Sequence, residues 1–173
     1  RGLRATPSLV RGGVLPSGTL NFTSGQTSQT ISLQVAGDYR LEASEGLRVE
    51  LYDPSTGASL GNASATATIT NDDTGLAITT TRSGLAEGDS GSVIHEFTVT
   101  RSGVTTGTTS VDWSLSGEVD AADFVGGVLP SGTVTFAPGE TSKVIQIAVR
   151  GDRDVEGNES FTVTLGNASG HAD

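Results

Sequence analysis

Apolar residues alternate with polar or small residues along most of the chain. Ile145, Ile147 and Val149 follow this period of two, and the stretch Phe161–Leu165 repeats it with Thr on the other face. Such alternation is typical of half-buried strands, and Thr suits the outer face of a sheet. Breakers such as "RSG", "LPSG" and "APGE" separate the stretches. We predict ten strands, at 18–23, 29–36, 46–51, 63–70, 76–81, 93–101, 109–115, 132–137, 143–150 and 159–165.

The sequence also repeats itself. The string "GGVLPSGT" occurs at Gly12–Thr19 and again at Gly126–Thr133, 114 residues later. The same offset places Phe22 on Phe136 and many other residues on similar ones. A period of this length is that of a whole β-sandwich domain, so the chain holds tandem modules.

The two copies begin and end at different points. Residues 1–73 read as the C-terminal part of a first module, and residues 74–173 as a second module without its final strand. We therefore predict an all-β fold of tandem Ig-like antiparallel β-sandwiches, the first lacking its N-terminal strands and the second its last strand. Trp113, the only tryptophan, is expected in the core between the sheets, and His95 is expected to be a half-exposed strand residue.

Composition narrows the function. The 20 acidic and 10 basic residues give a net charge of −10, which excludes nucleic acid as a partner and favours cations. The chain has no cysteine, and no apolar run approaches the ~20 residues that span a membrane. Phosphate-binding loops, nucleophile elbows and triads are absent from the sequence, so we expect no enzyme activity and no membrane insertion.

The string "DRDVEG" at residues 152–157 resembles the front half of an EF-hand loop. Its twelfth position is Val163 and its flanks are predicted strands, so the EF-hand is rejected. Instead, the loop joins two strands at one pole of a sandwich, where Glu87 and Asp123 are expected to converge with Asp152. Crowded carboxylates repel by about 1 kcal/mol per close pair. Either Ca²⁺ neutralises them, or the loops are solvated and hold no metal.

Several strings together resemble the Calx-beta repeat, which occurs in sodium–calcium exchangers and in long bacterial surface and secreted proteins. They are "AEGDSG", "FTVTRSG", "VDW", "ADF", "SGTVTFAPGETSKVIQIAV" and "VEGNESFTVTL", with "ATATITNDD" from the first copy. The resemblance covers the chain from Gly12 onward and is closer to the bacterial type. It implies calcium ligands at matching positions: Glu87, Asp123, Asp152, Glu156 and Glu159 in the second module, and Asp38, Glu42, Glu45, Asp72 and Asp73 in the first.

The chain departs from the family pattern at four of these places. Gly151 and Gly37 stand where a second acid often precedes the aspartate, Asn71 replaces a third terminal acid, and Leu9 falls at the position of Asp123. Fewer carboxylates imply weaker calcium binding than in the exchanger domains.

The resemblance implies a non-enzymatic, extracellular calcium-binding repeat of a long bacterial-type cell-surface protein with a structural or adhesion role. Calcium would stiffen it at the inter-module loops, since the second module begins near Gly75, directly after Asp72 and Asp73. Its partners would be calcium ions and neighbouring modules or subunits. The alternative is a subunit of a surface filament, assembled by strand complementation without metal. A glycan-binding module is a weaker alternative, because the sequence offers no aromatic platform.

Overall fold

The structure is a computed structural model that describes residues 3–7, 15–155 and 157–170. Within these ranges every regular element is a β-strand, all strand pairs are antiparallel, and no helix is formed. The chain divides into two compact units. The first lies within Arg1–Asp38 and Glu42–Asn71, and the second within Tyr39–Leu41 and Asp72–Asp173.

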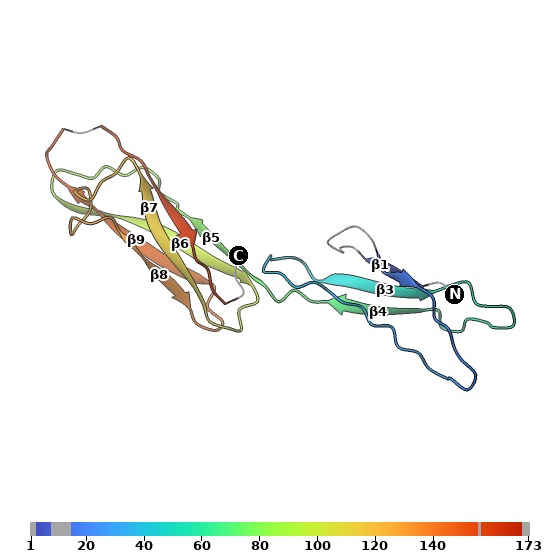
Figure 1. Cartoon of the computed structure of the whole chain (residues 1–173). Helices are drawn as coiled ribbons and strands as arrows, with labels where there is room; N and C mark the ends of the chain where they lie inside the picture. Colours follow the sequence, from blue (N-terminus) through green and yellow to red (C-terminus); the bar gives the residue numbers. More distant parts are fainter. Residues whose placement is uncertain (1–2, 8–14, 156, 171–173) are drawn as a thin grey trace. The chain divides into compact units, whose positions relative to one another are not determined.

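The first unit is a single four-stranded sheet in the order β2-β1-β3-β4 (Figure 1). Its central strand β3 pairs with β1 on one side and with β4 on the other. The strands are β1 (Leu3–Pro7), β2 (Ser17–Gly18), β3 (Glu45–Leu51) and β4 (Ser64–Ile69).

The second unit is a sandwich of two three-stranded sheets, in the orders β10-β7-β8 and β5-β6-β9 (Figure 1). This confirms the predicted all-β antiparallel fold. The strands are β5 (Thr74–Thr79), β6 (Gly91–Gly103), β7 (Thr109–Gly117), β8 (Ser131–Phe136), β9 (Ser142–Gly151) and β10 (Phe161–Gly166).

The predicted strands of the second unit are all confirmed, within a few residues at their ends. In the first unit, β3 and β4 are confirmed, but the strand predicted at 18–23 shrinks to Ser17–Gly18 and the strand predicted at 29–36 is wrong. The alternating pattern of 29–36 matches that of β9, which forms its ladder with β6. Among the described residues of the first unit, no strand pairs with residues 29–36. An alternating segment without a ladder partner does not form a strand.

The core of the second unit lies between its two sheets. Its buried residues come from both layers, and the loop residue Phe124 joins them, so the alternation in the sequence marks the inner faces correctly. Trp113 packs against this core at its rim, half-buried, with its indole over Gly132 of the neighbouring strand. The buried core residues are Val99, Val111, Phe124, Val134, Phe136, Ile145, Ile147 and Val163.

Two polar residues of β6 point inward in phase with the core. Arg101 is 3 % exposed, and its guanidinium donates to the Thr109 hydroxyl and to four backbone carbonyls while lying over the ring of Phe136. A buried cation is tolerated there because its donors are satisfied. His95 is 8 % exposed and makes an edge contact with Phe161, so the half-exposed position expected for it is wrong. Burial lowers the pKa of His95.

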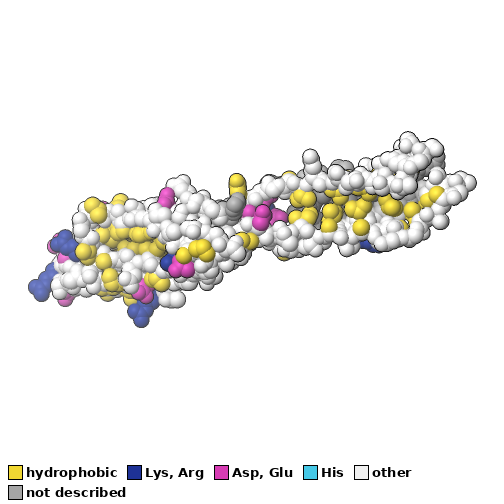
Figure 2. Space-filling view, turned by 90° about the horizontal axis from the view of Figure 1, so that it is seen from below, with side chains coloured by type: hydrophobic (Ala, Val, Ile, Leu, Met, Phe, Trp, Pro, Cys, Tyr) yellow, Lys and Arg dark blue, Asp and Glu magenta, His cyan; other side chains and the backbone are white. Residues whose placement is uncertain are grey.

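The first unit has no such core. Among residues 15–38 and 42–71, none is buried, and Leu47, Val49 and Leu51 of β3 are only half-buried. In Figure 2, hydrophobic side chains of this unit lie open to view along one face. A single sheet layer cannot cover its own apolar face.

Candidate functional site

Three acid-bearing segments of the second unit meet at the end of β9. The amide of Arg150 donates to the carbonyl of Asp123 at 2.7 Å. On the other side, the Glu87 and Gly88 carbonyls press against Gly151, where an added Cβ would lie 2.7 Å and 2.6 Å from them. The backbone therefore brings the loops of Glu87, Asp123 and Asp152 to one place, as the sequence predicts.

The side chains at this end are half-buried and hold their own loops. The carboxylate of Asp123 accepts the amide of Asp120 at 2.6 Å, and that of Asp152 accepts the amide of Asp154 at 2.9 Å. Such turns use one oxygen of each carboxylate and leave the remaining lone pairs for another donor or a cation. Asp154 itself is exposed and supplies only its backbone amide.

Of the other two predicted ligands in this unit, Glu159 is exposed two residues before β10, and Glu156 lies outside the described residues. The structure adds an acid that the family pattern did not mark. Glu118 accepts the amide and the hydroxyl of Ser160, at 3.3 Å and 3.2 Å, and so fastens the segment of Glu159 to the end of β7. The dense run of acids in "GEVDAAD" was the available signal for it.

In the first unit, Asn71 organises the acidic loop. The side-chain oxygen of Asn71 accepts the backbone amide of Glu42 at 3.1 Å. The backbone amide of Asn71 donates to the hydroxyl of Ser44 at 3.2 Å. Asp38 and Glu42 are exposed in this loop, and Glu45 is the first residue of β3. The residue that departs from the acidic pattern of the family thus holds the loop by neutral hydrogen bonds.

Asp72 and Asp73 belong to the second unit, at the start of β5. Asp72 is exposed, while Asp73 is buried and its carbonyl accepts the amide of Val104 at 3.0 Å. The hydroxyl of Thr74 donates to the Val104 carbonyl at 2.6 Å and closes the same corner.

The donor set suits a hard cation in kind but is not gathered as a metal site. Carboxylate and carbonyl oxygens are the ligands that Ca²⁺ takes. In the part of the chain that the structure describes, however, no three His, Cys, Asp or Glu side chains lie close enough together to hold a metal ion. The segments meet through their backbones, and the carboxylates of Asp123 and Asp152 each accept an amide of their own loop.

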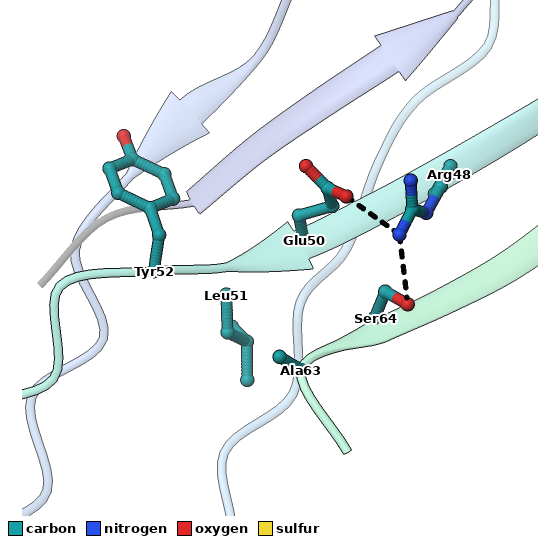
Figure 3. Close-up of a pocket in the computed structure, with 6 residues that line it drawn as sticks. All are labelled: Arg48, Glu50, Leu51, Tyr52, Ala63 and Ser64. Atoms are coloured by element: carbon teal, nitrogen blue, oxygen red, sulfur yellow. Dashed lines mark hydrogen bonds and ion pairs between the residues drawn. The ribbon is translucent and has the colours of Figure 1, made fainter. Parts of the chain in front are cut away.

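A shallow pocket lies on the first unit, away from these loops in sequence. In Figure 3, Arg48 sits between Glu50 and Ser64, with an ion pair of 2.8 Å to Glu50 and a hydrogen bond of 3.4 Å to Ser64. Leu51, Tyr52 and Ala63 complete the lining. An exposed ion pair of this kind contributes little to stability and offers no reactive group for catalysis.

Comparison with known proteins places the chain in a family. The Calx-beta domain profile matches residues 14–74 and 87–173, and the chain belongs to the Calx-beta domain family.

Three relatives illustrate the similarity. The chain is 30 % identical over 183 residues to Adhesion G-protein coupled receptor V1 of Danio rerio. The aligned region covers 97 % of this chain and 3 % of that receptor. The solved structure of calcium binding domain CBD12 of CALX1.1 is 25 % identical, with a TM-score of 0.43, over 96 % of this chain and 66 % of that one. The apo-form Calx CBD1 domain is 26 % identical, with a TM-score of 0.40, over 46 % and 70 %.

The chain thus spans a small fraction of the receptor that it matches. Among the described residues, no helix has the length and apolar character needed to cross a membrane.

Proposed function

We propose that the chain is a non-enzymatic calcium-binding repeat with a structural or adhesion role in a long extracellular protein of the bacterial tandem type. The observation that carries this proposal is the meeting of the Glu87, Asp123 and Asp152 loops at the Arg150–Gly151 backbone. Membership of the Calx-beta family, the net charge of −10 and the similarity to an adhesion receptor support it.

Calcium supplies positive charge that removes the repulsion between these carboxylates. Asp123 and Asp152 are the ligands that we assign first, because each is half-buried and fixed by a turn that leaves oxygen lone pairs available. Glu87 and Glu159 complete the set, with Glu156. Because the carboxylates are not gathered, binding must draw them together, so we expect a Kd of about 10⁻⁴–10⁻³ M, typical of extracellular modules.

Isothermal titration calorimetry of the whole chain tests this proposal. The Asp152→Asn variant keeps an oxygen that can accept the Asp154 amide but loses the negative charge. We therefore expect the calcium affinity of the second unit to fall at least about tenfold. Asp154→Asn is the matched control, since Asp154 is exposed and contributes only its amide. Equal loss in both variants, or no calcium heat up to about 10 mM with the unchanged chain, contradicts the proposal.

The structural role has its own readout. If calcium stiffens the chain at the inter-module loops, small-angle scattering will show a narrower distribution of distances with calcium than with chelator, and Asp72→Asn will reduce that difference. If calcium binds without any change in scattering, the chain is a calcium-binding module and the proposed stiffening is wrong.

A second candidate function is supported by a different observation. Among the described residues, strand β10 is an edge strand, because its sheet ends there in the order β10-β7-β8. Open edges pair readily with strands of other chains. A subunit that assembles by strand complementation, without metal, would use such an edge.

A further inference from the structure

We infer that the buried guanidinium of Arg101 is a built-in cation, which gathers two loops of the second unit and holds the start of β5 in place without calcium. Arg101 lies on β6 and is 3 % exposed. The two loops lie where β9 begins, at Ser142, whereas the acid-bearing loops meet where β9 ends, at Gly151. The built-in cation therefore lies at the opposite end of β9 from the proposed calcium site, and its role goes beyond that proposal.

Every N–H group of the guanidinium has an oxygen acceptor. Nε donates to one oxygen and each terminal nitrogen donates to two, which accounts for all the donors of an arginine side chain. None of these acceptors is a carboxylate, so the positive charge is stabilised by dipoles and by the ring of Phe136, whose centroid lies 5.4 Å from Cζ. The acceptors are the carbonyls of Thr105, Gly107, Ala137 and Glu140 and the hydroxyl of Thr109, at 2.9–3.1 Å.

These acceptors join two loops that are far apart in the sequence. One loop, residues 104–108, connects β6 to β7, and the other, residues 137–141, connects β8 to β9. The Thr105 carbonyl accepts from Arg101 and also from the Gly139 amide at 2.8 Å, so the two loops meet at this oxygen. Carbonyl oxygens that point at one place repel each other unless positive charge lies between them, and Ca²⁺ sites use the same arrangement. Here the chain supplies that charge itself.

The loop of residues 104–108 also holds the start of β5. The Val104 amide donates to the Asp73 carbonyl at 3.0 Å, and the Thr74 hydroxyl donates to the Val104 carbonyl at 2.6 Å. Gly103 turns the chain onto this corner with a φ of 77°, and an added Cβ there would press against the Asp73 carbonyl. Thr74 is 2 % exposed, so water competes little for these hydrogen bonds. The position of Asp73 and Thr74 thus depends on the loop that Arg101 gathers.

Both the shape and the charge of arginine are needed at this position. Lysine presents a single nitrogen on a flexible stem and cannot reach acceptors spread around a planar fork. A neutral, short residue would leave the carbonyls of both loops without a donor in a largely buried place. We therefore expect substitutions of Arg101 to loosen the two loops and the start of β5 before they loosen the rest of the unit.

Native-state hydrogen exchange of the whole chain tests this role at the Val104 amide, once in chelator and once in calcium. The unchanged chain should protect Val104 equally in both, because the built-in cation is always present. Arg101→Lys should make the Val104 amide exchange at least about tenfold faster, with a smaller change at the Arg150 amide near the other end of β9. Arg153→Lys is the matched control, since Arg153 is exposed, and it should leave Val104 unchanged.

Chemical rescue separates the charge of Arg101 from its packing. Arg101→Ala leaves room for a free guanidinium ion, which should restore the protection of Val104 at a concentration too low to unfold the chain. Urea at the same concentration has a similar planar shape without the charge and should not restore it. If Arg101→Ala does not fold, the comparison of Arg101→Lys with Arg153→Lys decides.

Three results would overturn the built-in cation. The first is equal rescue by urea and guanidinium, and the second is Val104 exchange that neither Arg101 substitution accelerates. The third is loss of Val104 protection in the unchanged chain when chelator replaces calcium, which would assign this corner to a metal ion. Each result is read at Val104 and not from calcium affinity, so it is distinguishable from a failure of the calcium proposal.

Discussion

The two units carry the same repeat and bury it very differently. Phe22 and Phe136 occupy corresponding positions, yet Phe136 is 0 % exposed and Phe22 is 57 % exposed. Ile31 and Ile145 show the same contrast in kind, half-buried in one unit and buried in the other. The difference is the second sheet layer, which only the second unit has among the described residues. Burial is thus a property of the layers, and the residue alone does not determine it.

The turns, in contrast, are the same in both units. Gly25 and Gly139 both have a φ of 83°, in the left-handed region that favours glycine. In both turns the residue after the glycine accepts a hydrogen bond from the backbone amide three residues earlier. Gln26 accepts from Thr23 at 3.2 Å, and Glu140 accepts from Ala137 at 2.7 Å. Local sequence fixes such a turn even where its flanking segments differ in structure.

The strongest test of this comparison is the phenylalanine pair. Phe136→Ala should lower the free energy of unfolding of the second unit by about 3–5 kcal/mol, because it leaves a cavity under Arg101. Phe22→Ala should change stability by less than about 0.5 kcal/mol, because most of its ring is already in water.

Denaturant unfolding followed by tryptophan fluorescence measures the first effect, since Trp113 is the only tryptophan and lies in the second unit. Hydrogen exchange at β3 and β4 measures the first unit. A loss of similar size from both variants would mean that the apolar face of the first unit is covered in solution.

The glycine pair sharpens the comparison at the acidic loops. Gly151→Ala would place a methyl group against the carbonyls of Glu87 and Gly88, which are backbone atoms and cannot move aside singly. We expect a loss of about 1–3 kcal/mol in the second unit. Gly37, its counterpart, has nothing within 4 Å of an added Cβ, so Gly37→Ala should be nearly neutral.

The same fluorescence and exchange measurements apply to this pair. Calcium affinity adds a second readout, because the methyl group at position 151 would push the Glu87 loop away from Asp152. If Gly151→Ala leaves both stability and calcium binding unchanged, the three loops do not meet as described.

Much of the fold could be predicted from the sequence, because a period of two specifies strands whose faces differ. The six strands of the second unit follow it, and so do β3 and β4. Residues 29–36 have the same pattern and form no strand, because a ladder needs a partner that the pattern cannot supply. His95, predicted to be half-exposed, shows the opposite error, and Arg101 is buried on the same strand. Polar residues in phase with the core are buried when hydrogen bonds or aromatic contacts accommodate them.

The candidate site was predictable to a lesser extent. Loop order placed Glu87, Asp123 and Asp152 at one end, and the backbone contacts agree. The directions of the Asp123 and Asp152 carboxylates were not predictable, because each accepts an amide within its own loop. The role of Asn71 was not predictable either, since a neutral amide gives no charge signal. Whether the ten predicted acids bind metal remains a prediction.

His95 gives a smaller, pH-dependent test of the buried layer. Burial lowers its pKa below the ordinary value, so the folded state favours the neutral ring and the unfolded state binds the proton more tightly. Stability of the second unit should therefore fall as pH decreases through about 6.5 toward the lower folded pKa. His95→Gln should abolish this fall between about pH 7.5 and 5.5, as measured by fluorescence midpoints. A slope that persists in His95→Gln would assign the effect to other groups.

The smallest expected effect distinguishes the two copies of the repeated turn by charge alone. A hydrogen bond from Lys143 lowers the pKa of Glu140 first, and the amide of Ala137 lowers it further. Its stabilising contribution is therefore present above the ordinary glutamate pKa and is lost as pH falls below it. Gln26 holds the corresponding turn with a neutral amide, and Gln29 donates to it at 3.1 Å in place of Lys143. Glu140→Gln should thus keep the turn and lower the unfolding midpoint slightly at pH 7. The unfolding midpoint of this variant should then fall less steeply between about pH 6 and 3 than that of the unchanged chain. Asp112 also has a lowered pKa, through Thr133 and Asn167, so some acid dependence should remain. If Glu140→Gln loses stability equally at every pH, the charge is not what the second turn adds to the first.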